Sequence, residues 1–317
     1  MMDRNWRFLD DVMAGLSATP KFLLSKYFYN KKGDELFQKI MRCPEYYLTR
    51  CEEEILNLQS PCIANTVKKY SEDLEVIGLG AGDGSKSVYL LKEFYNLELI
   101  DTYSPVDISD NVIRLLEENI PKEIPGLKVK GFHGEYIEML QRINQISKKQ
   151  KIILFLGSNI GNYFPDQALH FCGLLYQQMR AGDLLLIGFD LKKHPQVILN
   201  AYNDKQGFTR EFNLNLLMRI NCELGGDFKI EHFDHYAVYD PVSGSCKSFL
   251  VSLKDQQVKI ASDFSVNFYK DEAIQMEVSQ KYDIESIDGM AEKSGFKGLK
   301  KFYDSKRWFV DCLWQRI

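Results

Sequence analysis

Short apolar runs alternate with helical stretches between residues 72 and 190, and this rhythm constrains the fold more than any other feature. Valine, isoleucine and leucine follow one another directly in these runs, which is typical of strands covered on both faces. The predicted strands are 74–78, 102–106, 127–132, 151–156 and 184–189, and the predicted helices are 85–94, 110–119, 135–146 and 166–179. Five β–α units in about 120 residues indicate a doubly wound α/β sheet with parallel strands.

The rhythm is different on both sides of this region. Residues 1–60 have helical periodicity, as do 196–224, whereas 228–238 and 245–253 alternate like a hairpin. The last 35 residues predict a helix and a closing pair of strands. We therefore expect two domains, a sheet domain of residues 61–190 plus 283–317 and a second α+β lobe. The second lobe would combine residues 1–60 with 191–282, an insertion after the fifth strand.

Charge, cysteines and hydropathy exclude several classes of protein. The 317 residues carry a net charge of −4, so no basic field points to nucleic acid or an anionic membrane. Seven cysteines without a Cys-x-x-Cys pair argue against a disulfide framework or a zinc site, and we expect no metal. The apolar runs are far shorter than the roughly 20 residues of a membrane span, and Asp3 stands where a signal peptide needs positive charge. We expect a cytoplasmic protein with no nucleic-acid or membrane partner; the oligomeric state is open, with a monomer as the expectation.

A glycine-rich loop joins the first predicted strand to the first predicted helix. It reads Leu-Gly-Ala-Gly-Asp-Gly-Ser-Lys and contains Gly80, Gly82 and Lys86. The dinucleotide pattern G-x-G-x-x-G fails in either register, and the P-loop pattern fails because Ser85 precedes Lys86. The remaining form, G-x-G-x-G, is typical of enzymes that bind S-adenosylmethionine (SAM). Asp107, at the end of the second strand, is placed to hold the ribose hydroxyls; the alternative is a tight turn without a ligand.

Several segments in order resemble the histidine-specific SAM methyltransferases, the family of the L-histidine Nα-methyltransferase of ergothioneine biosynthesis. The matching segments lie between about residues 20 and 282. They are Tyr27-Phe28-Tyr29, Gly33-Asp34-Glu35-Leu36-Phe37, Pro44-Glu45-Tyr46-Tyr47-Leu48-Thr49-Arg50, the glycine loop, Pro105-Val106-Asp107, Phe155-Leu156-Gly157-Ser158-Asn159-Ile160-Gly161-Asn162, Ala201-Tyr202-Asn203-Asp204, Phe212-Asn213-Leu214-Asn215 and Glu277-Val278-Ser279. The resemblance implies a Rossmann-like class I SAM methyltransferase sheet, with a substrate-binding second lobe.

The resemblance also implies roles for individual residues. SAM would be bound by Gly80, Gly82, Lys86, Asp107, Glu135 and Tyr136. The carboxylate of L-histidine would be held by Asn162 and Tyr202, and its imidazole by Glu277 and Ser279. Tyr29 and Tyr46 would close the pocket, and the Gly157 carbonyl would accept a hydrogen bond from the amine.

These roles suit methyl transfer, which needs a neutral amine aligned with the sulfonium methyl and no protein nucleophile. A free α-amine titrates near ~8, so part of it is neutral at pH 7–8. A carboxylate such as Glu277 would select a basic ring over an apolar one.

Each residue also has a plainer interpretation. The Tyr29 region could be core aromatics, Asn162 a helix cap near Asp166, and Glu277 a solvated helix face. The segment His232-Phe233-Asp234-His235 invites a metal interpretation, but in a strand His235 points away from the other two.

One departure from the family bears on the substrate. Ser248 stands where the histidine enzymes often place a methionine against the ring, which could leave room for a bulkier ring. Three hypotheses remain: Nα-methylation of L-histidine, possibly to the trimethyl betaine; N-methylation of another amino acid or aromatic amine; and a SAM-binding sensor or scaffold without turnover.

Overall fold

The computed structural model describes residues 2–262 and 264–317, the side chains of residues 2–5 excepted. The chain divides into two compact units. Unit 1 contains Met1–Tyr47 and Lys193–Ser279, and unit 2 contains Leu48–Lys192 and Gln280–Ile317. The first boundary lies earlier than the predicted break at residue 60. Helix α3 (Tyr47–Val67) accounts for the difference, because its buried Ile55, Leu56 and Ile63 belong to unit 2.

Unit 2 is built on one eight-stranded sheet. Its strands are β2 (Leu74–Leu79), β3 (Ile100–Asp107), β4 (Lys128–Val129), β5 (Phe132–His133), β6 (Gln150–Phe155), β7 (Leu184–Asp190), β13 (Phe296–Tyr303) and β14 (Phe309–Arg316). They run in the order β13-β14-β7-β6-β2-β3-β4, with β5 also paired to β3. The pairs from β7 to β5 are parallel, and β14 is antiparallel to both of its neighbours. The predicted doubly wound α/β fold is confirmed.

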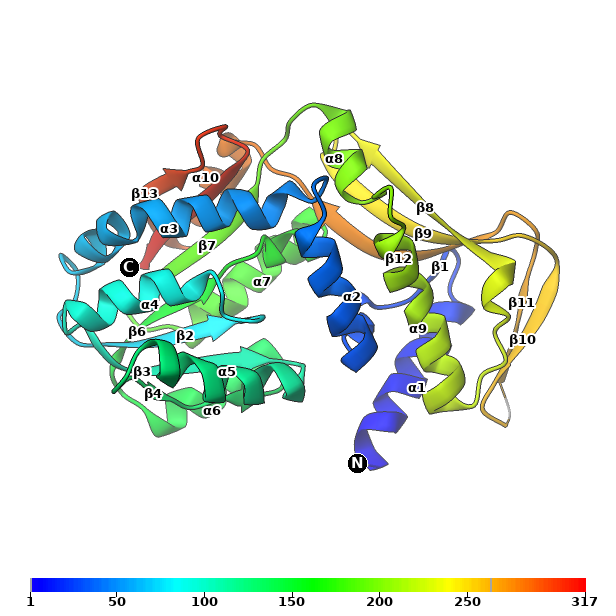
Figure 1. Ribbon diagram of the computed structural model, residues 1–317, viewed down its shortest axis with the longest axis horizontal. Coiled ribbons are helices and arrows are strands. Elements are labelled where there is room, and N and C mark those ends of the chain that lie inside the picture. Colours follow the sequence, from blue (N-terminus) through cyan, green and yellow to red (C-terminus); the bar gives the residue numbers. More distant parts are fainter. Residues whose placement is uncertain (1, 263) are drawn as a thin grey trace. The chain divides into compact units, whose positions relative to one another are not determined.

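Helices cover both faces of this sheet (Figure 1). They are α3, α4 (Ser87–Asn96), α5 (Asp110–Glu123), α6 (Tyr136–Ile146), α7 (Pro165–Gln178) and α10 (Ile284–Lys293). Helices α6, α7 and α10 share one buried cluster with the strands, and α3, α4 and α5 lie on the other face (Figure 1). The chain order reverses between β2 and β6, and ligands of such sheets bind at the carboxyl ends of the strands at this point.

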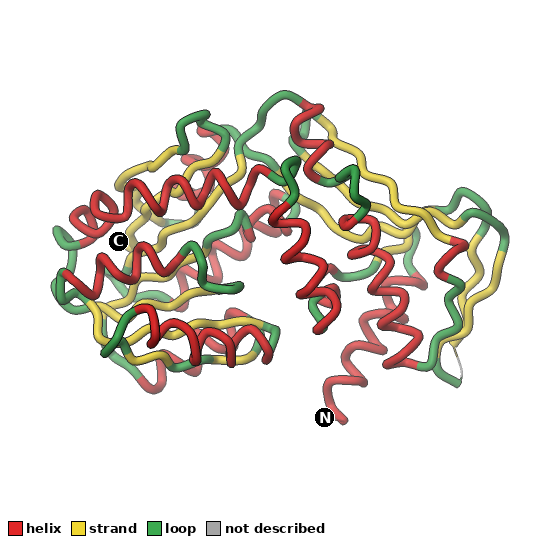
Figure 2. The backbone as a smooth tube through the Cα atoms, in the orientation of Figure 1, coloured by secondary structure: helices red, strands yellow, loops and turns green. Residues whose placement is uncertain are grey.

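Unit 1 packs helices on a smaller sheet of order β1-β12-β9-β8. Its elements are α1 (Met2–Ser17), β1 (Lys21–Phe22), η1 (Ser25–Phe28), α2 (Lys31–Arg42), α8 (Pro195–Ala201), α9 (Phe208–Leu224), η3 (Ile230–His232), β8 (Phe233–Asp240), β9 (Ser245–Ser252), the hairpin β10 (Gln256–Ile260) and β11 (Phe264–Phe268), and β12 (Ala273–Gln280). Figure 2 distinguishes these helices from the strands. One apolar core joins residues of both chain segments, among them Phe8, Leu36, Phe212 and Leu250.

Polar contacts fix how α2 begins. The Asn30 side chain accepts a hydrogen bond from the Gly33 backbone N–H at 2.8 Å and another from the Asn215 amide at 3.0 Å. Asn30 is therefore the N-cap of α2 and ties it to α9. The Gly-Asp-Glu-Leu-Phe and Phe-Asn-Leu-Asn segments thus meet in the folded chain.

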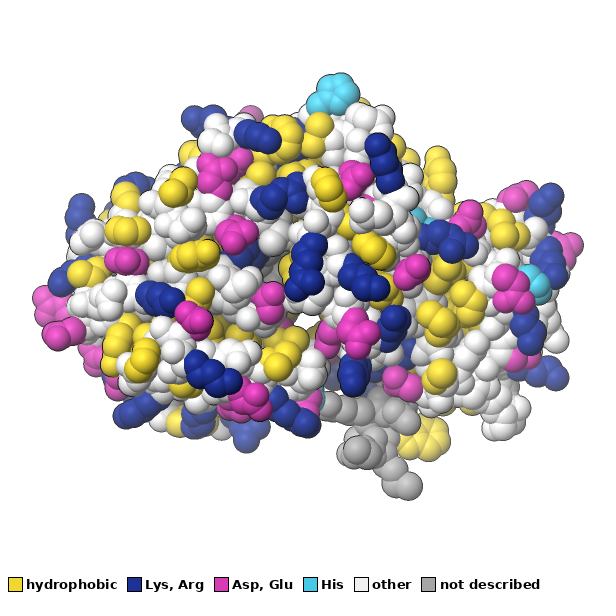
Figure 3. All heavy atoms as spheres, in the orientation of Figure 1, with side chains coloured by type: hydrophobic (Ala, Val, Ile, Leu, Met, Phe, Trp, Pro, Cys, Tyr) yellow, Lys and Arg dark blue, Asp and Glu magenta, His cyan; other side chains and the backbone are white. Residues whose placement is uncertain are grey.

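The surface mixes charges of both signs. On the face seen in Figure 3, lysine and arginine side chains are interspersed with aspartate and glutamate. Within the described residues, no helix has the length and apolar character that a membrane span requires.

Candidate functional site

The glycine loop follows β2 at the carboxyl edge of the unit 2 sheet. Gly80, Gly82 and Gly84 have φ values of +64°, +56° and +74°, a region that L side chains rarely adopt. A Cβ on Gly84 would lie 2.6 Å from a methyl group of Leu116, so the loop also packs too closely on α5 for a side chain there. Backbone conformation thus favours glycine at all three positions, and packing on α5 also excludes a side chain at Gly84.

Asp107 ends β3 beside this loop. One of its carboxylate oxygens accepts from the Gly82 backbone N–H at 3.3 Å, and the other from the Ser109 backbone N–H at 2.9 Å. Asp107 is half-buried, and it connects the loop after β2 to the start of α5. A carboxylate is thereby held at the edge where the sequence predicts the ribose site.

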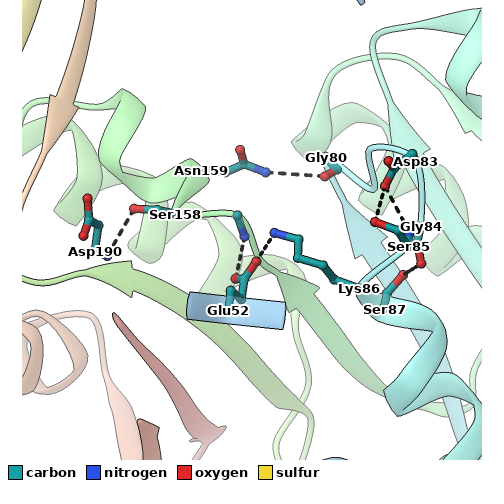
Figure 4. A network of polar contacts seen from close by, with 11 residues as sticks. Glu52, Gly80, Asp83, Gly84, Ser85, Lys86, Ser87, Ser158, Asn159 and Asp190 are labelled. Carbon is teal, nitrogen blue, oxygen red and sulfur yellow. Dashed lines mark hydrogen bonds and ion pairs between the residues drawn. The ribbon is translucent and has the colours of Figure 1, made fainter. Parts of the chain in front are cut away.

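Tyr136 and Asn159 approach the loop at Gly80. A Cβ on Gly80 would lie 2.6 Å from the Tyr136 hydroxyl and 2.5 Å from the Asn159 amide nitrogen, which donates to the Gly80 carbonyl at 3.4 Å. Figure 4 shows Asn159 directed at Gly80. Glu135, the N-cap residue of α6, immediately precedes Tyr136. Asn159 belongs to the motif of residues 155–162, but its sequence position alone does not identify it as a site residue.

Lys86 forms an ion pair with Glu52 of α3 (Figure 4). The Glu52 side chain is fully buried, and its Oε1 accepts from the Gly157 backbone N–H at 2.6 Å. One carboxylate thus joins the loop after β2 to the loop after β6. Sequence reasoning missed Glu52, because it stands among three consecutive glutamates and only folding shows which of them is buried.

The segment after β6 has an unusual backbone. Gly157 and Ser158 have φ values of +75° and +55°, and the Ser158 hydroxyl accepts from the Asp190 backbone N–H at 3.2 Å (Figure 4). Strained backbone of this kind clusters at functional sites. Asn162 is exposed at the end of the 3₁₀ turn η2 (Asn159–Asn162), and α7 has Phe164 as its N-cap. The interpretation of Asn162 as the cap of that helix is therefore wrong.

Unit 1 brings the predicted tyrosines together in a chain of ring contacts. Tyr29 packs edge-on against Phe37 with 5.7 Å between ring centroids, Phe37 against Tyr46 at 6.3 Å, and Tyr46 against Tyr202 at 6.2 Å. The Tyr202 hydroxyl hydrogen-bonds the Ser279 hydroxyl at 2.6 Å. Residues from three distant parts of the sequence therefore form one cluster.

Glu277 precedes Ser279 by two positions on β12, so both side chains leave the strand on the same side. Glu277 is half-buried on a strand, and the interpretation of it as a solvated helix face is wrong. Ser248 is buried on β9, the neighbour of β12 in the sheet.

The His232–His235 segment shows other contacts. His232 hydrogen-bonds Gln256, Asp234 pairs with Arg210, and burial lowers the pKa of His235 to about 4. No group of three or more His, Cys, Asp or Glu able to hold a metal ion occurs among the described residues.

The candidate residues form two groups, one in each unit. Unit 1 carries Tyr29, Tyr46, Tyr202, Glu277 and Ser279, and unit 2 carries Gly80, Gly82, Lys86, Asp107, Glu135, Tyr136, Gly157 and Asn162.

Comparison with known proteins adds a family and relatives. Residues 8–316 match the family described as "Histidine-specific methyltransferase, SAM-dependent". The chain is 34% identical over 288 residues to "Histidine N-alpha-methyltransferase" of Mycolicibacterium smegmatis, covering 90% of this chain and 88% of the relative. It is 33% identical over 302 residues to the protein of the same name from Mycobacterium tuberculosis, covering 95% and 90%. "Ergothioneine biosynthesis protein 1" of Neurospora crassa is 29% identical over 298 residues, which are 89% of this chain and 32% of that longer protein.

Proposed function

Because the chain belongs to the family of SAM-dependent, histidine-specific methyltransferases, we propose that it transfers a methyl group from SAM to the α-amine of L-histidine. The observation that carries the proposal is the match over almost the whole chain, which includes both groups of candidate residues. A sensor without turnover would have no need to retain the substrate group. This chain retains that group, since Tyr202 hydrogen-bonds Ser279 and Glu277 lies on the same strand as Ser279.

The residues of unit 2 fit SAM. When bound, SAM supplies an electrophilic methyl group on its sulfonium. We assign its amino-acid end to the glycine loop and Lys86, because a Cβ on Gly82 would meet no atom within 4 Å and Lys86 offers an ammonium for a carboxylate. Asp107 would hold the ribose hydroxyls, and Glu135 and Tyr136 the adenine.

The residues of unit 1 fit the side chain of histidine. We assign Glu277 and Ser279 to the two imidazole nitrogens, since a carboxylate and a hydroxyl can accept from both. Tyr202, whose hydroxyl bonds that of Ser279, would hold the carboxylate. Tyr29 and Tyr46 would exclude water, because they belong to an aromatic cluster that packs on an apolar core.

With both ends of histidine held, the α-amine remains the group free to receive the methyl. The Gly157 carbonyl is assigned to orient it, and the Glu52 carboxylate holds the preceding peptide by accepting from the Gly157 N–H. A free α-amine has a pKa near ~8, so a neutral fraction with an available lone pair exists at pH 7–8. Proximity and alignment then supply most of the catalysis. Further rounds, up to the trimethyl betaine, require only rotation about the Cα–N bond.

Mass spectrometry of the product made from L-histidine and SAM tests this proposal directly. Fragmentation should place every added methyl on the α-amine, with mono-, di- and trimethylated species appearing in that order. A methyl on the ring would contradict the roles of Glu277 and Ser279. If no amino acid gave a methylated product, the proposal that the protein is an enzyme would be wrong.

Ser248 favours one second candidate, an amino acid with a larger ring. A serine is smaller than the methionine that the family often has at this position, and Ser248 is buried on β9, the strand next to β12. Calorimetric titration of the protein with histidine and with tryptophan, each in the presence of S-adenosylhomocysteine, separates the candidates. Tighter binding of tryptophan would favour the second.

We further propose that the enzyme works in the cytoplasm. All seven cysteines are thiols, and five of them are buried, which suits a reducing compartment. Fractionation of cells with an antibody to the protein would test this location.

A further inference from the structure

Two buried carboxyl groups meet beneath the loops of unit 2. Asp311 stands on β14 directly opposite Gly188 of β7, and Glu52 reaches the same place from α3. A Cβ on Gly188 would lie 2.5 Å from Glu52 Oε1 and 3.0 Å from Asp311 Oδ1. Both acids are 0% exposed. A glycine at 188 is what lets the two carboxyl groups share this space.

The two acids differ in their partners. Glu52 pairs with the Lys86 ammonium and accepts from the Gly157 N–H, whereas neither oxygen of Asp311 has a hydrogen-bond partner among the described residues. Burial, and then the charge of Glu52, raise the pKa of Asp311 well above its usual range, and Lys86 opposes them only in part. Burial and the neighbouring carboxylate therefore both favour the protonated form of Asp311.

Other charges near this place are already balanced. Asp190, two residues from Gly188 on the same strand, forms a fully buried ion pair with Lys281 at 2.7 Å. Glu52 and Lys86 are accordingly the charged groups that act on Asp311.

We propose that protonated Asp311 is a positioning residue that holds Glu52 in place, and that Glu52 in turn sets the Lys86 ammonium and the backbone at Gly157 for SAM and the substrate amine. The inference rests on the proposed function. A protonated carboxyl can donate to a carboxylate, so Asp311 would add a third contact to the two that Glu52 makes with Lys86 and Gly157. An ammonium has three donors, so Lys86 retains donors for a SAM carboxylate after binding Glu52.

Alkaline pH should weaken SAM binding by removing the proton of Asp311. Loss of the Asp311 proton places two like charges in a dry site, and the second carboxylate competes with Glu52 for Lys86. SAM affinity should then fall as the pH rises through the raised pKa of Asp311.

Calorimetric titration with S-adenosylhomocysteine between pH 6 and 10 tests the proposal in the full-length protein. Wild type should lose affinity at the alkaline end. Asp311→Leu, which cannot donate, should bind about tenfold or more weakly across the range. Asp311→Asn keeps a donor that does not titrate, so it should rescue the affinity that Asp311→Leu loses and should lack the alkaline decline.

Asp183→Asn is the matched control. Asp183 is another buried carboxyl of unit 2 with a pKa raised by burial, but it accepts from the backbone N–H groups of Lys151 and Arg180. Its variant should lower thermal stability and leave the pH profile of ligand binding unchanged. A profile altered equally by Asp183→Asn would overturn the specific role of Asp311.

The remaining outcomes are also decisive. The proposal would be wrong if the S-adenosylhomocysteine affinity of Asp311→Asn declined at alkaline pH as in wild type. It would also be wrong if Asp311→Leu bound S-adenosylhomocysteine as tightly as wild type. If Asp311→Leu does not fold, the profile of Asp311→Asn decides alone. Ligand binding with the expected profiles but without methylated histidine would contradict the proposed function and leave the positioning role standing.

Discussion

Asp107 has two structural contacts besides its proposed role, since it accepts from Gly82 and Ser109. Its carboxylate is thus aligned before any ligand arrives. Preorganisation of this kind reduces the free energy that ordering costs on binding.

Asp107→Ala should weaken S-adenosylhomocysteine binding by about 1–3 kcal/mol, the value of charge-assisted hydrogen bonds to hydroxyls. Histidine affinity should change little. Calorimetric titration measures the affinities for S-adenosylhomocysteine and for histidine. Asp101→Ala is the control, because Asp101 is exposed on the same strand and pairs with Lys149 at 3.1 Å. Equal losses in both variants would remove Asp107 from the ribose site.

Glu277→Ala should raise the KM for histidine strongly and leave SAM affinity unchanged, because the lost contact belongs to the imidazole. Steady-state kinetics with each substrate varied in turn measures this. Gln275→Ala is the matched control on the same side of β12, and the Gln275 backbone carbonyl, which accepts from the Leu23 N–H at 2.9 Å, is retained in this variant. A similar loss in both variants would indicate a disturbed strand instead of a ring contact.

Some residues of the site could be predicted and others could not. Gly80, Gly82 and Asp107 stand at fixed places in a strand–loop–helix pattern, so local sequence locates them. Glu52, Asn159 and Asp311 depend on contacts between distant segments. Asp311 lies in an apolar strand, where nothing local distinguishes a buried acid from an edge residue.

At the scale of elements, periodicity located most helices and strands of unit 2, but it failed at one place there and at others in unit 1. The predicted strand 127–132 is two short pairings, β4 and β5, because the chain leaves the sheet at Lys130–Gly131. The β10–β11 hairpin was missed, since its strands alternate apolar residues with Gln, Lys and Asn and resemble loop. The predicted helical region 196–224 is broken between α8 and α9.

Asp204 governs the start of α9 after this break. Its carboxylate accepts from the Phe208 and Thr209 backbone N–H groups at 2.9 and 2.7 Å. Burial alone would raise the pKa of Asp204, but these hydrogen bonds lower it. Its stabilisation is therefore complete above about pH 4, the pKa of an unfolded aspartate, and is lost as the pH falls through the lower folded pKa.

Asp204→Ala should lower the free energy of unfolding by about 1–3 kcal/mol at pH 7, because two N–H groups lose their acceptor. Urea denaturation at pH 7 and pH 3 should show the gap to wild type narrowing at the lower pH. Lys205→Ala, an exposed neighbour, should have little effect. A gap that is the same at both pH values would mean that the charge of Asp204 contributes nothing.

At the scale of the whole molecule, each unit has its own apolar core, and the proposed ligands divide between them. The division was partly visible in the sequence as a change of rhythm. The sequence does not show that α3 packs in unit 2, because a helix within a helical region has no sequence feature that identifies the core it joins.

Hydrogen exchange should reveal this division. S-adenosylhomocysteine should slow amide exchange at 80–86 and 157–162 of unit 2, and histidine added afterwards should slow it at 200–204 and 277–279 of unit 1. Amides of the β10–β11 hairpin should be unaffected by either. Protection by S-adenosylhomocysteine that spares the glycine loop would contradict the assignment of SAM to unit 2.

The segment 193–279 leaves and re-enters unit 2 at neighbouring points. Leu191 is bridged to Tyr282, and the Lys192 N–H donates to the Tyr282 carbonyl at 2.8 Å. Segments whose ends lie close together are tolerated as replacements in a host domain. An exchange of 193–279 together with 1–47, taken from a relative with another amine preference, should therefore transplant substrate choice onto an unaltered methyl-donor scaffold.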